Sequence, residues 1–108
     1  MKLLIAIVQD EDLYGLRDDL TKEGFRITKL SSTGGFLKSG NSTLIIGTED
    51  DLVDKCLSII KSDCKARTAT QSVTNANMPG ATYMSAPVDV MVGGATIFIV
   101  DVYKYYKF

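Results

Sequence analysis

Residues 3–30 read LLIAIVQDEDLYGLRDDLTKEGFRITKL, and this stretch decides how the chain begins to fold. Its first six residues form a continuous apolar run, which is typical of a short strand buried on both faces. Residues 10–23 carry acidic side chains in the first turn and leucines at helical spacing, so they predict a helix. Gly24 follows directly and is a suitable residue to end that helix. The stretch therefore predicts a strand, a helix and the start of a second strand.

The second strand is expected over residues 25–32, where the apolar pattern changes to a period of two. Phe25 and Ile27 fall on one face, toward the core, while Arg26 and Thr28 fall on the opposite face. The pattern thus separates core residues from residues that are free for another role.

Residues 33–41 contain three glycines and are expected to form a connection rather than a regular element. Strand character returns at residues 42–47. Thr48 is then expected to start a second helix, with Asp51 three residues later in an approximate capping box. Apolar positions after Thr48 follow the spacing of an amphipathic helix, which predicts one core-facing side.

Beyond the second helix, the chain is rich in small and polar residues. Residues 64–86 are expected to form a mobile loop, within which residues 68–73 have some strand character. Residues 88–92 alternate, residues 93–94 are a glycine pair and residues 95–102 are apolar, which together predict a hairpin.

The expected order is β-α-β-β-α-β with an extra hairpin arm. We therefore predict one α+β domain over residues 1–108, a ferredoxin-like sandwich. Two helices cover only one face of a four-stranded sheet, yet residues 3–8, 44–46 and 97–100 are apolar at adjacent positions. Each exposed aliphatic side chain would forgo about 1.5–3 kcal/mol of burial. We therefore expect other subunits to cover the second face, in a closed ring.

Composition excludes several classes of function. Twelve basic and 13 acidic residues give a formal net charge of −1, so no basic field is available for nucleic acid or an anionic membrane. The chain has no histidine, which excludes hydrolysis by a Ser-His or Cys-His pair. The cysteines, Cys56 and Cys64, cannot complete a four-ligand zinc site alone. With no apolar run long enough to cross a bilayer, we expect a cytoplasmic protein with reduced thiols.

Residues 26–41 carry the parts of a nucleotide site. Arg26 offers a planar fork of donors to phosphate, and Thr28 adds a hydroxyl on the same face. Residues 34–35 are glycines that let the backbone approach an anion closely. Phe36 offers a ring for base stacking, and the Asn41 amide matches an adenine edge. Each feature also has an ordinary explanation, as a turn, a core or subunit contact, or a solvated charge.

Taken together, several motifs resemble those of the PII-like cyclic di-AMP receptor proteins. The matching segments are residues 1–3, 8–10, 25–30, 32–37, 40–41 and 92–96, together with Phe98. The similarity covers essentially the whole chain apart from residues 64–86.

This resemblance implies a homotrimer with three cyclic di-AMP sites, one in each cleft between neighbouring subunits. The implied ligand-binding residues are Arg26, Thr28, Gly35, Phe36, Leu37, Asn41, Gly47 and Phe98. Arg26 and Thr28 would hold phosphate, Asn41 and Gly47 would contact adenine, and Phe98 with the C-terminal tail would help to enclose the ligand.

The leading hypothesis is a signal receptor and not an enzyme, with no cofactor and no metal. Binding would order residues 64–86 and change the surface offered to a downstream protein of unknown identity. One alternative is a PII-like sensor of ATP, ADP or another mononucleotide. Another is a metal-dependent nucleotide hydrolase using Glu49, Asp50 and Asp51, although the position of these carboxylates at a helix start explains them more simply.

Overall fold

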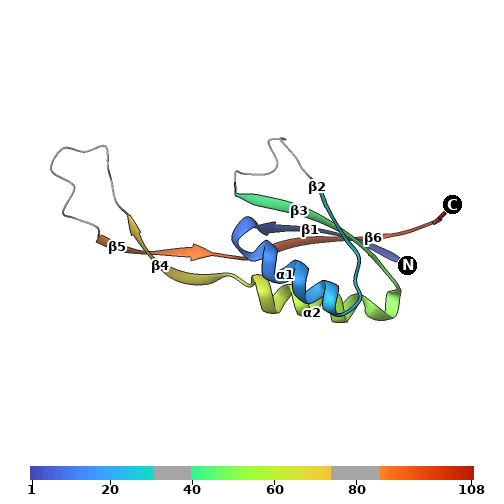
Figure 1. The fold of residues 1–108 in the computed structure, drawn as a ribbon, viewed down its shortest axis with the longest axis horizontal. Coiled ribbons are helices and arrows are strands. Elements are labelled where there is room, and N and C mark those ends of the chain that lie inside the picture. Colours follow the sequence, from blue (N-terminus) through green and yellow to red (C-terminus); the bar gives the residue numbers. More distant parts are fainter. Residues whose placement is uncertain (31–39, 74–85) are drawn as a thin grey trace.

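The computed structural model describes residues 1–30, 40–73 and 86–108 of the 108-residue chain (Figure 1). Its elements are β1 (Lys2–Gln9), α1 (Asp10–Lys22), β2 (Ile27–Leu30), β3 (Asn41–Thr48), the 3-10 turn η1 (Asp50–Leu52), α2 (Val53–Cys64), β4 (Arg67–Val73), β5 (Ala86–Val92) and β6 (Ala95–Asp101). The expected α+β class and the order of the first five main elements are confirmed.

Among the described residues, the main sheet has four antiparallel strands in the order β2-β3-β1-β6. Helix α1 packs over β1, β2 and β3, and α2 packs over β1 and β6, so both helices lie on one face (Figure 1). This arrangement is consistent with a ferredoxin-like fold. Neither helix is long and apolar enough to cross a membrane.

The core lies between the sheet and the two helices. Alternate residues of β1, namely Leu4, Ala6 and Val8, are almost fully buried beneath the helices. Leu16 and Leu20 of α1 meet them from above. Burial of each leucine contributes about 1.5–3 kcal/mol to stability, so this layer fixes the position of the sheet.

Gly24 ends α1 as the sequence predicts. Its φ angle is +87°, its N–H donates to the Thr21 carbonyl at 3.0 Å, and the Phe25 N–H donates to the Leu20 carbonyl at 3.0 Å. These two bonds form a Schellman motif, in which glycine avoids the cost of a left-handed conformation. Leu20 and Phe25 both join the buried core, so the turn directs β2 back across the sheet.

The predicted hairpin between residues 88–92 and 95–102 is wrong. Strand β5 pairs with β4 in a separate two-stranded arm, and β6 pairs with β1 in the main sheet. Gly93 and Gly94, with φ angles of +80° and +90°, join the arm to the sheet instead of turning a hairpin. The arm projects from the body, and the molecule measures 62 Å along its longest axis (Figure 1).

Part of the segment that was expected to be a mobile loop is ordered secondary structure. Cys64 ends α2, and residues 67–73 form β4, which confirms the strand character of that stretch. Residues 74–85 lie outside the described residues, so a loop there stays a prediction.

The predicted capping box at Thr48 is also wrong. Thr48 is the last residue of β3 and is buried, and helical structure begins at Asp50 as the turn η1. Neither Glu49, which precedes η1, nor Leu52, which precedes α2, makes a side-chain cap hydrogen bond. The β3 pairing with β1 therefore takes precedence over the local capping signal.

Both cysteines lie on the core side of α2. Cys56 and Cys64 are free and fully buried, so both act as small core residues. Burial raises the pKa of each thiol to about 11. Both therefore stay protonated at neutral pH.

Two carboxyl groups face each other between the helices. Burial, followed by the hydrogen bond and charge of Asp19, raises the pKa of Asp63 to about 6. The Asp63 Oδ2 atom is buried without a hydrogen-bond partner among the described residues. At neutral pH, Asp63 is therefore ionised next to another carboxylate, which opposes the packing of α1 on α2.

We predict that Asp63→Asn stabilises the protein at neutral pH. Because the pKa of Asp63 is raised on folding, its contribution to the free energy of unfolding is fully present below pH 3.8. That contribution is lost as the pH rises through about 6. The gain from asparagine should therefore grow across that interval to on the order of 1–2 kcal/mol. Urea unfolding from pH 4 to pH 8 measures it. The same change at Asp54, exposed near the other end of the same helix, is the control; equal pH profiles for the two variants would contradict the assignment.

Candidate functional site

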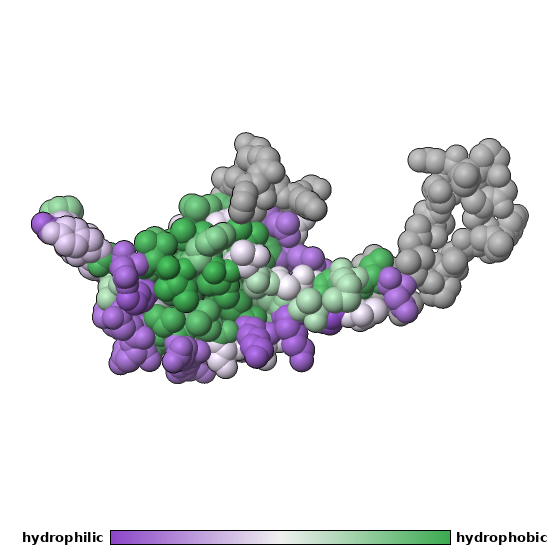
Figure 2. Space-filling view, turned by 180° about the vertical axis from the view of Figure 1, so that it is seen from behind, coloured by the Kyte–Doolittle hydropathy of each residue, from purple (hydrophilic) through white to green (hydrophobic). Residues whose placement is uncertain are grey.

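The face of the sheet away from the helices is largely apolar, and neither α1 nor α2 covers it. Alternation along the strands places Leu3, Ile5 and Ile7 of β1 on this face, and the strand register adds Phe98 and Val100 of β6. Both β6 side chains are 46% exposed. Figure 2 shows the resulting patch, bordered by hydrophilic residues. We call this surface the open face.

Most described candidate residues fall on the open face, but at different places. The register aligns Thr28 with Ile45, Ile45 with Ile5, and Ile5 with Phe98. Thr28 and Phe98 therefore lie in one row but on the two edge strands. Three strand spacings separate them, which is about 14 Å. One protomer does not bring these two residues together.

Arg26 and Gly47 do come together, at the end of the sheet where β2 begins and β3 ends. Both line a hollow of about 230 Å³, which we call the Arg26 hollow. Its other lining residues are Met1, Glu23, Gly24, Phe25, Thr48, Glu49 and Leu52. Arg26 is exposed, and none of the ion pairs among the described residues uses it. Its guanidinium is therefore available to an anion.

Gly47 leaves the Arg26 hollow open. A Cβ atom at this position would meet no heavy atom within 4 Å, and the backbone does not have a positive φ angle. The glycine is therefore not required by the fold. Its missing side chain makes space next to the arginine.

Asn41 lies at the opposite end of β3, six residues from Gly47 and about 20 Å along the strand. It is half-buried and aligned with Gln9 of β1. The Asp10 N–H donates to the Gly40 carbonyl at 2.8 Å, and the Ser42 hydroxyl donates to the Asp10 carboxylate. These bonds fix the start of β3, where Asn41 sits. Gly35, Phe36 and Leu37 lie outside the described residues.

The C-terminal tail leaves the sheet at the same end as the Arg26 hollow, because Lys2 is aligned with both Thr48 and Asp101. The Val102 N–H donates to the Met1 carbonyl at 3.2 Å. Beyond that bond, Tyr103 is 91% exposed. The rings of Tyr106 and Phe108 stack with centroids 6.1 Å apart. The tail thus carries exposed aromatic residues, and its backbone extends away from the body of the molecule (Figure 1).

One of the carboxylates after β3 has a structural partner. Asp50 pairs with the N-terminal amine of Met1 at 2.9 Å, and this hydrogen bond lowers the pKa of Asp50. Across the described residues, no group of three or more Asp, Glu, Cys or His side chains is placed to hold a metal ion.

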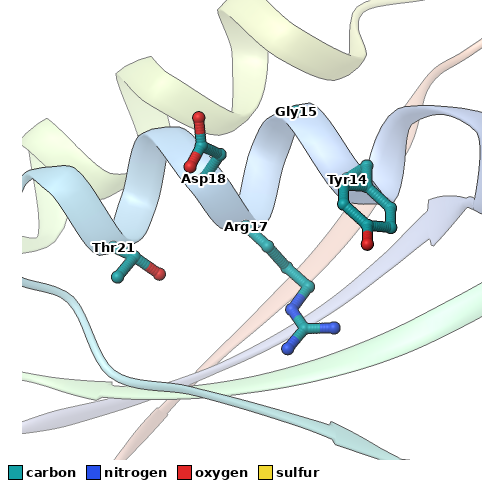
Figure 3. Close-up of a pocket in the computed structure, with 5 residues that line it drawn as sticks. All are labelled: Tyr14, Gly15, Arg17, Asp18 and Thr21. Atoms are coloured by element: carbon teal, nitrogen blue, oxygen red, sulfur yellow. The ribbon is translucent and has the colours of Figure 1, made fainter.

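A second hollow, of about 550 Å³, lies on the outer side of α1 (Figure 3). Its lining residues are Tyr14, Gly15, Arg17, Asp18 and Thr21, and Figure 3 shows Arg17 extending from the helix between Tyr14 and Thr21. Sequence reasoning missed it, although a glycine inside a helix next to a tyrosine was an available signal. Because its described lining comes from one helix, we regard it as a surface depression. The Arg26 hollow is smaller but is formed by several elements.

The fold and the site together place the chain among α+β sandwiches whose sheet has one open face. The cyclic-di-AMP receptor family matches residues 1–108, and the chain belongs to that family. This confirms the family that the sequence motifs resemble. It also supports cyclic di-AMP binding in signalling as the general function.

A crystal structure of a functionally unknown protein from Pediococcus pentosaceus ATCC 25745 is similar to this chain. The two are 41% identical in sequence and superpose with a TM-score of 0.78. The match covers 99% of this chain and 96% of the other. The similarity therefore extends over the whole fold.

Proposed function

We propose that this protein is a cytoplasmic signal receptor that binds cyclic di-AMP in clefts between the subunits of a homotrimer. The observation that carries the proposal is the exposed Arg26, which forms no ion pair with a described carboxylate, beside the space left by Gly47, in a member of a cyclic-di-AMP receptor family. An exposed cation next to an open hollow suits an anionic ligand, and the backbone near Gly47 is accessible to a base. Two carboxylates, Glu23 and Glu49, also line the hollow, and Glu23 is paired with Lys55 at 2.7 Å.

The positions of the site residues support a shared cleft. Arg26, Thr28 and Gly47 lie toward the β2 edge of the sheet, whereas Phe98 and the aromatic tail belong to the β6 edge. If the β2 edge of one copy adjoins the β6 edge of the next, the two halves of a site meet. Contacts between unlike edges propagate in one direction, and they close as a ring where the rotation between copies allows it.

The open face supports the same assembly. Its half-exposed aliphatic and aromatic side chains would gain from burial against neighbouring copies. The number three follows from the resemblance of the sequence motifs to PII-like proteins. In the trimer, Gly35, Phe36 and Leu37 would line the pocket and Asn41 would contact adenine. The arm would transmit binding to a downstream protein.

We predict that Arg26→Ala weakens cyclic di-AMP binding by about 1.5–3 kcal/mol, or roughly 10- to 150-fold, because a charge-assisted phosphate contact is lost. Isothermal titration of wild type and variant measures the change. Arg17→Ala, in the depression on α1, is the matched control and should bind as the wild type does.

A flat wild-type titration at micromolar concentrations would refute the proposed function. Displacement of cyclic di-AMP by ATP at similar concentrations would instead favour a mononucleotide sensor.

Gly47→Leu should fill the Arg26 hollow without weakening the fold, because its Cβ meets open space and leucine fits strand geometry. We expect at least a tenfold loss of cyclic di-AMP affinity with an unchanged melting temperature. Gly15→Leu also places its Cβ in open space but fills the depression on α1. The hollow would be misassigned if Gly15→Leu abolished binding and Gly47→Leu did not.

Sedimentation velocity tests the assembly. We expect a trimer for the wild type and a monomer for Ile5→Asp, because a carboxylate in the middle of the open face cannot be buried against another copy without a partner. Tyr14→Asp changes an equally conspicuous apolar residue, 88% exposed on α1, and should leave the trimer intact. A wild-type monomer at micromolar concentrations would contradict the shared cleft.

A further inference from the structure

Residues 9–12, where β1 runs into α1, contact two separate parts of the molecule. We call this segment the junction. One side of it holds the base of the β4–β5 arm, and the other side holds the start of β3, where Asn41 lies. Figure 1 shows the arm leaving the body at this end, where β1 ends and α1 begins.

On the arm side, the junction makes an ion pair and a hydrogen bond. The Arg67 guanidinium reaches both oxygens of Asp12, with Nη2 at 2.7 Å from Oδ1 and Nη1 at 3.5 Å from Oδ2. The Gly93 N–H donates to Gln9 Oε1 at 2.7 Å. The first contact fastens β4 and the second fastens the end of β5. Both strands of the arm are therefore tied to the same short segment.

Gln9 is unusual for its place in the fold. It occupies the N-cap position of α1, where a side chain usually accepts a hydrogen bond from the first turn. Here the Gln9 side chain makes no cap bond and binds Gly93 instead. The helix start thus forgoes a local stabilising bond, and the side chain is committed to the arm.

The arm depends on this attachment. A two-stranded hairpin alone is marginally stable in water. The Asp12 side chain is only 5% exposed, so departure of Arg67 would leave a buried carboxylate without its counter-charge. Release of the arm therefore requires the first turn of α1 to move and hydrate Asp12.

That movement would reach the candidate ligand site. The first turn also carries Asp10, whose N–H bonds to the Gly40 carbonyl and whose carboxylate accepts from Ser42. These residues flank Asn41, which is also aligned with Gln9. The same few residues thus set both the arm and the end of β3 that would contact adenine.

We propose that the junction couples the arm to the ligand site, with Asp12 and Gln9 as positioning residues. This inference rests on the proposed function, because the coupled ligand is cyclic di-AMP. The arm has a fastened state, with the Asp12–Arg67 pair formed, and a released state, with it broken. Ligand held by Asn41 fixes the junction and favours the fastened state; by reciprocity, the fastened arm strengthens ligand binding.

Amide hydrogen exchange at residues 67–73 and 86–92, with and without cyclic di-AMP, tests this coupling. In the wild type, we expect ligand to slow exchange in the arm. Asp12→Asn removes the ion pair and leaves no buried charge at residue 12. The amide exchange rate of the arm without ligand should therefore rise at least tenfold. Ligand binding should weaken by about fivefold or more. Asp54→Asn, at an exposed position near the start of α2 and outside the junction, should change neither.

A second pair of variants covers the case in which Asp12→Asn does not fold. A Cβ at Gly93 would lie 2.7 Å from the Lys65 carbonyl and 2.6 Å from Arg67 Nη1, whereas a Cβ at Gly94 meets only Ala66, at 3.9 Å. Both glycines have positive φ angles, so Gly94→Ala controls for backbone strain. Gly93→Ala should therefore raise amide exchange in the arm and weaken cyclic di-AMP binding more than Gly94→Ala does.

The outcomes separate the two proposals. The wild type could bind cyclic di-AMP while the amide exchange rate of the arm changes neither with ligand nor in Asp12→Asn. In that case the coupling is overturned and the proposed function stands. If the wild type binds no cyclic di-AMP, the flat titration overturns the proposed function and the coupling with it.

Discussion

A four-stranded sheet with helices on one side has a second side that two helices cannot cover. In this protein that second side carries isoleucines, Phe98 and Val100 rather than the polar residues of a solvated sheet. Burial of this side against other copies would be favourable, and the proposed assembly depends on that gain.

The sequence predicted best where local chemistry and long-range packing agree. The apolar run of β1, the acidic first turn of α1 and Gly24 all act within one or two turns of chain, and the core confirms each of them. Prediction failed where a distant partner decided the outcome. Val88–Val92 followed by two glycines is a good local hairpin signal, but β1 pairs with β6 and leaves β5 to β4.

The candidate site divides in a similar way. Alternation was enough to separate outward Arg26 and Thr28 from inward Phe25, and the structure agrees for Phe25, which is buried. The distances between site residues could not be read from the sequence, because they follow from strand order and register. Only the register shows that Thr28 and Phe98 lie on opposite edges, and only the packed structure reveals the space beside Gly47.

The burial of Cys56 and Cys64 has a consequence for the conditions in which such a receptor works. With pKa values near 11, neither sulfur forms the thiolate that peroxides and electrophiles attack. The two core sulfur atoms are therefore poor sites for oxidation. Replacing a surface residue by cysteine would accordingly give a single reactive position for attaching a fluorophore.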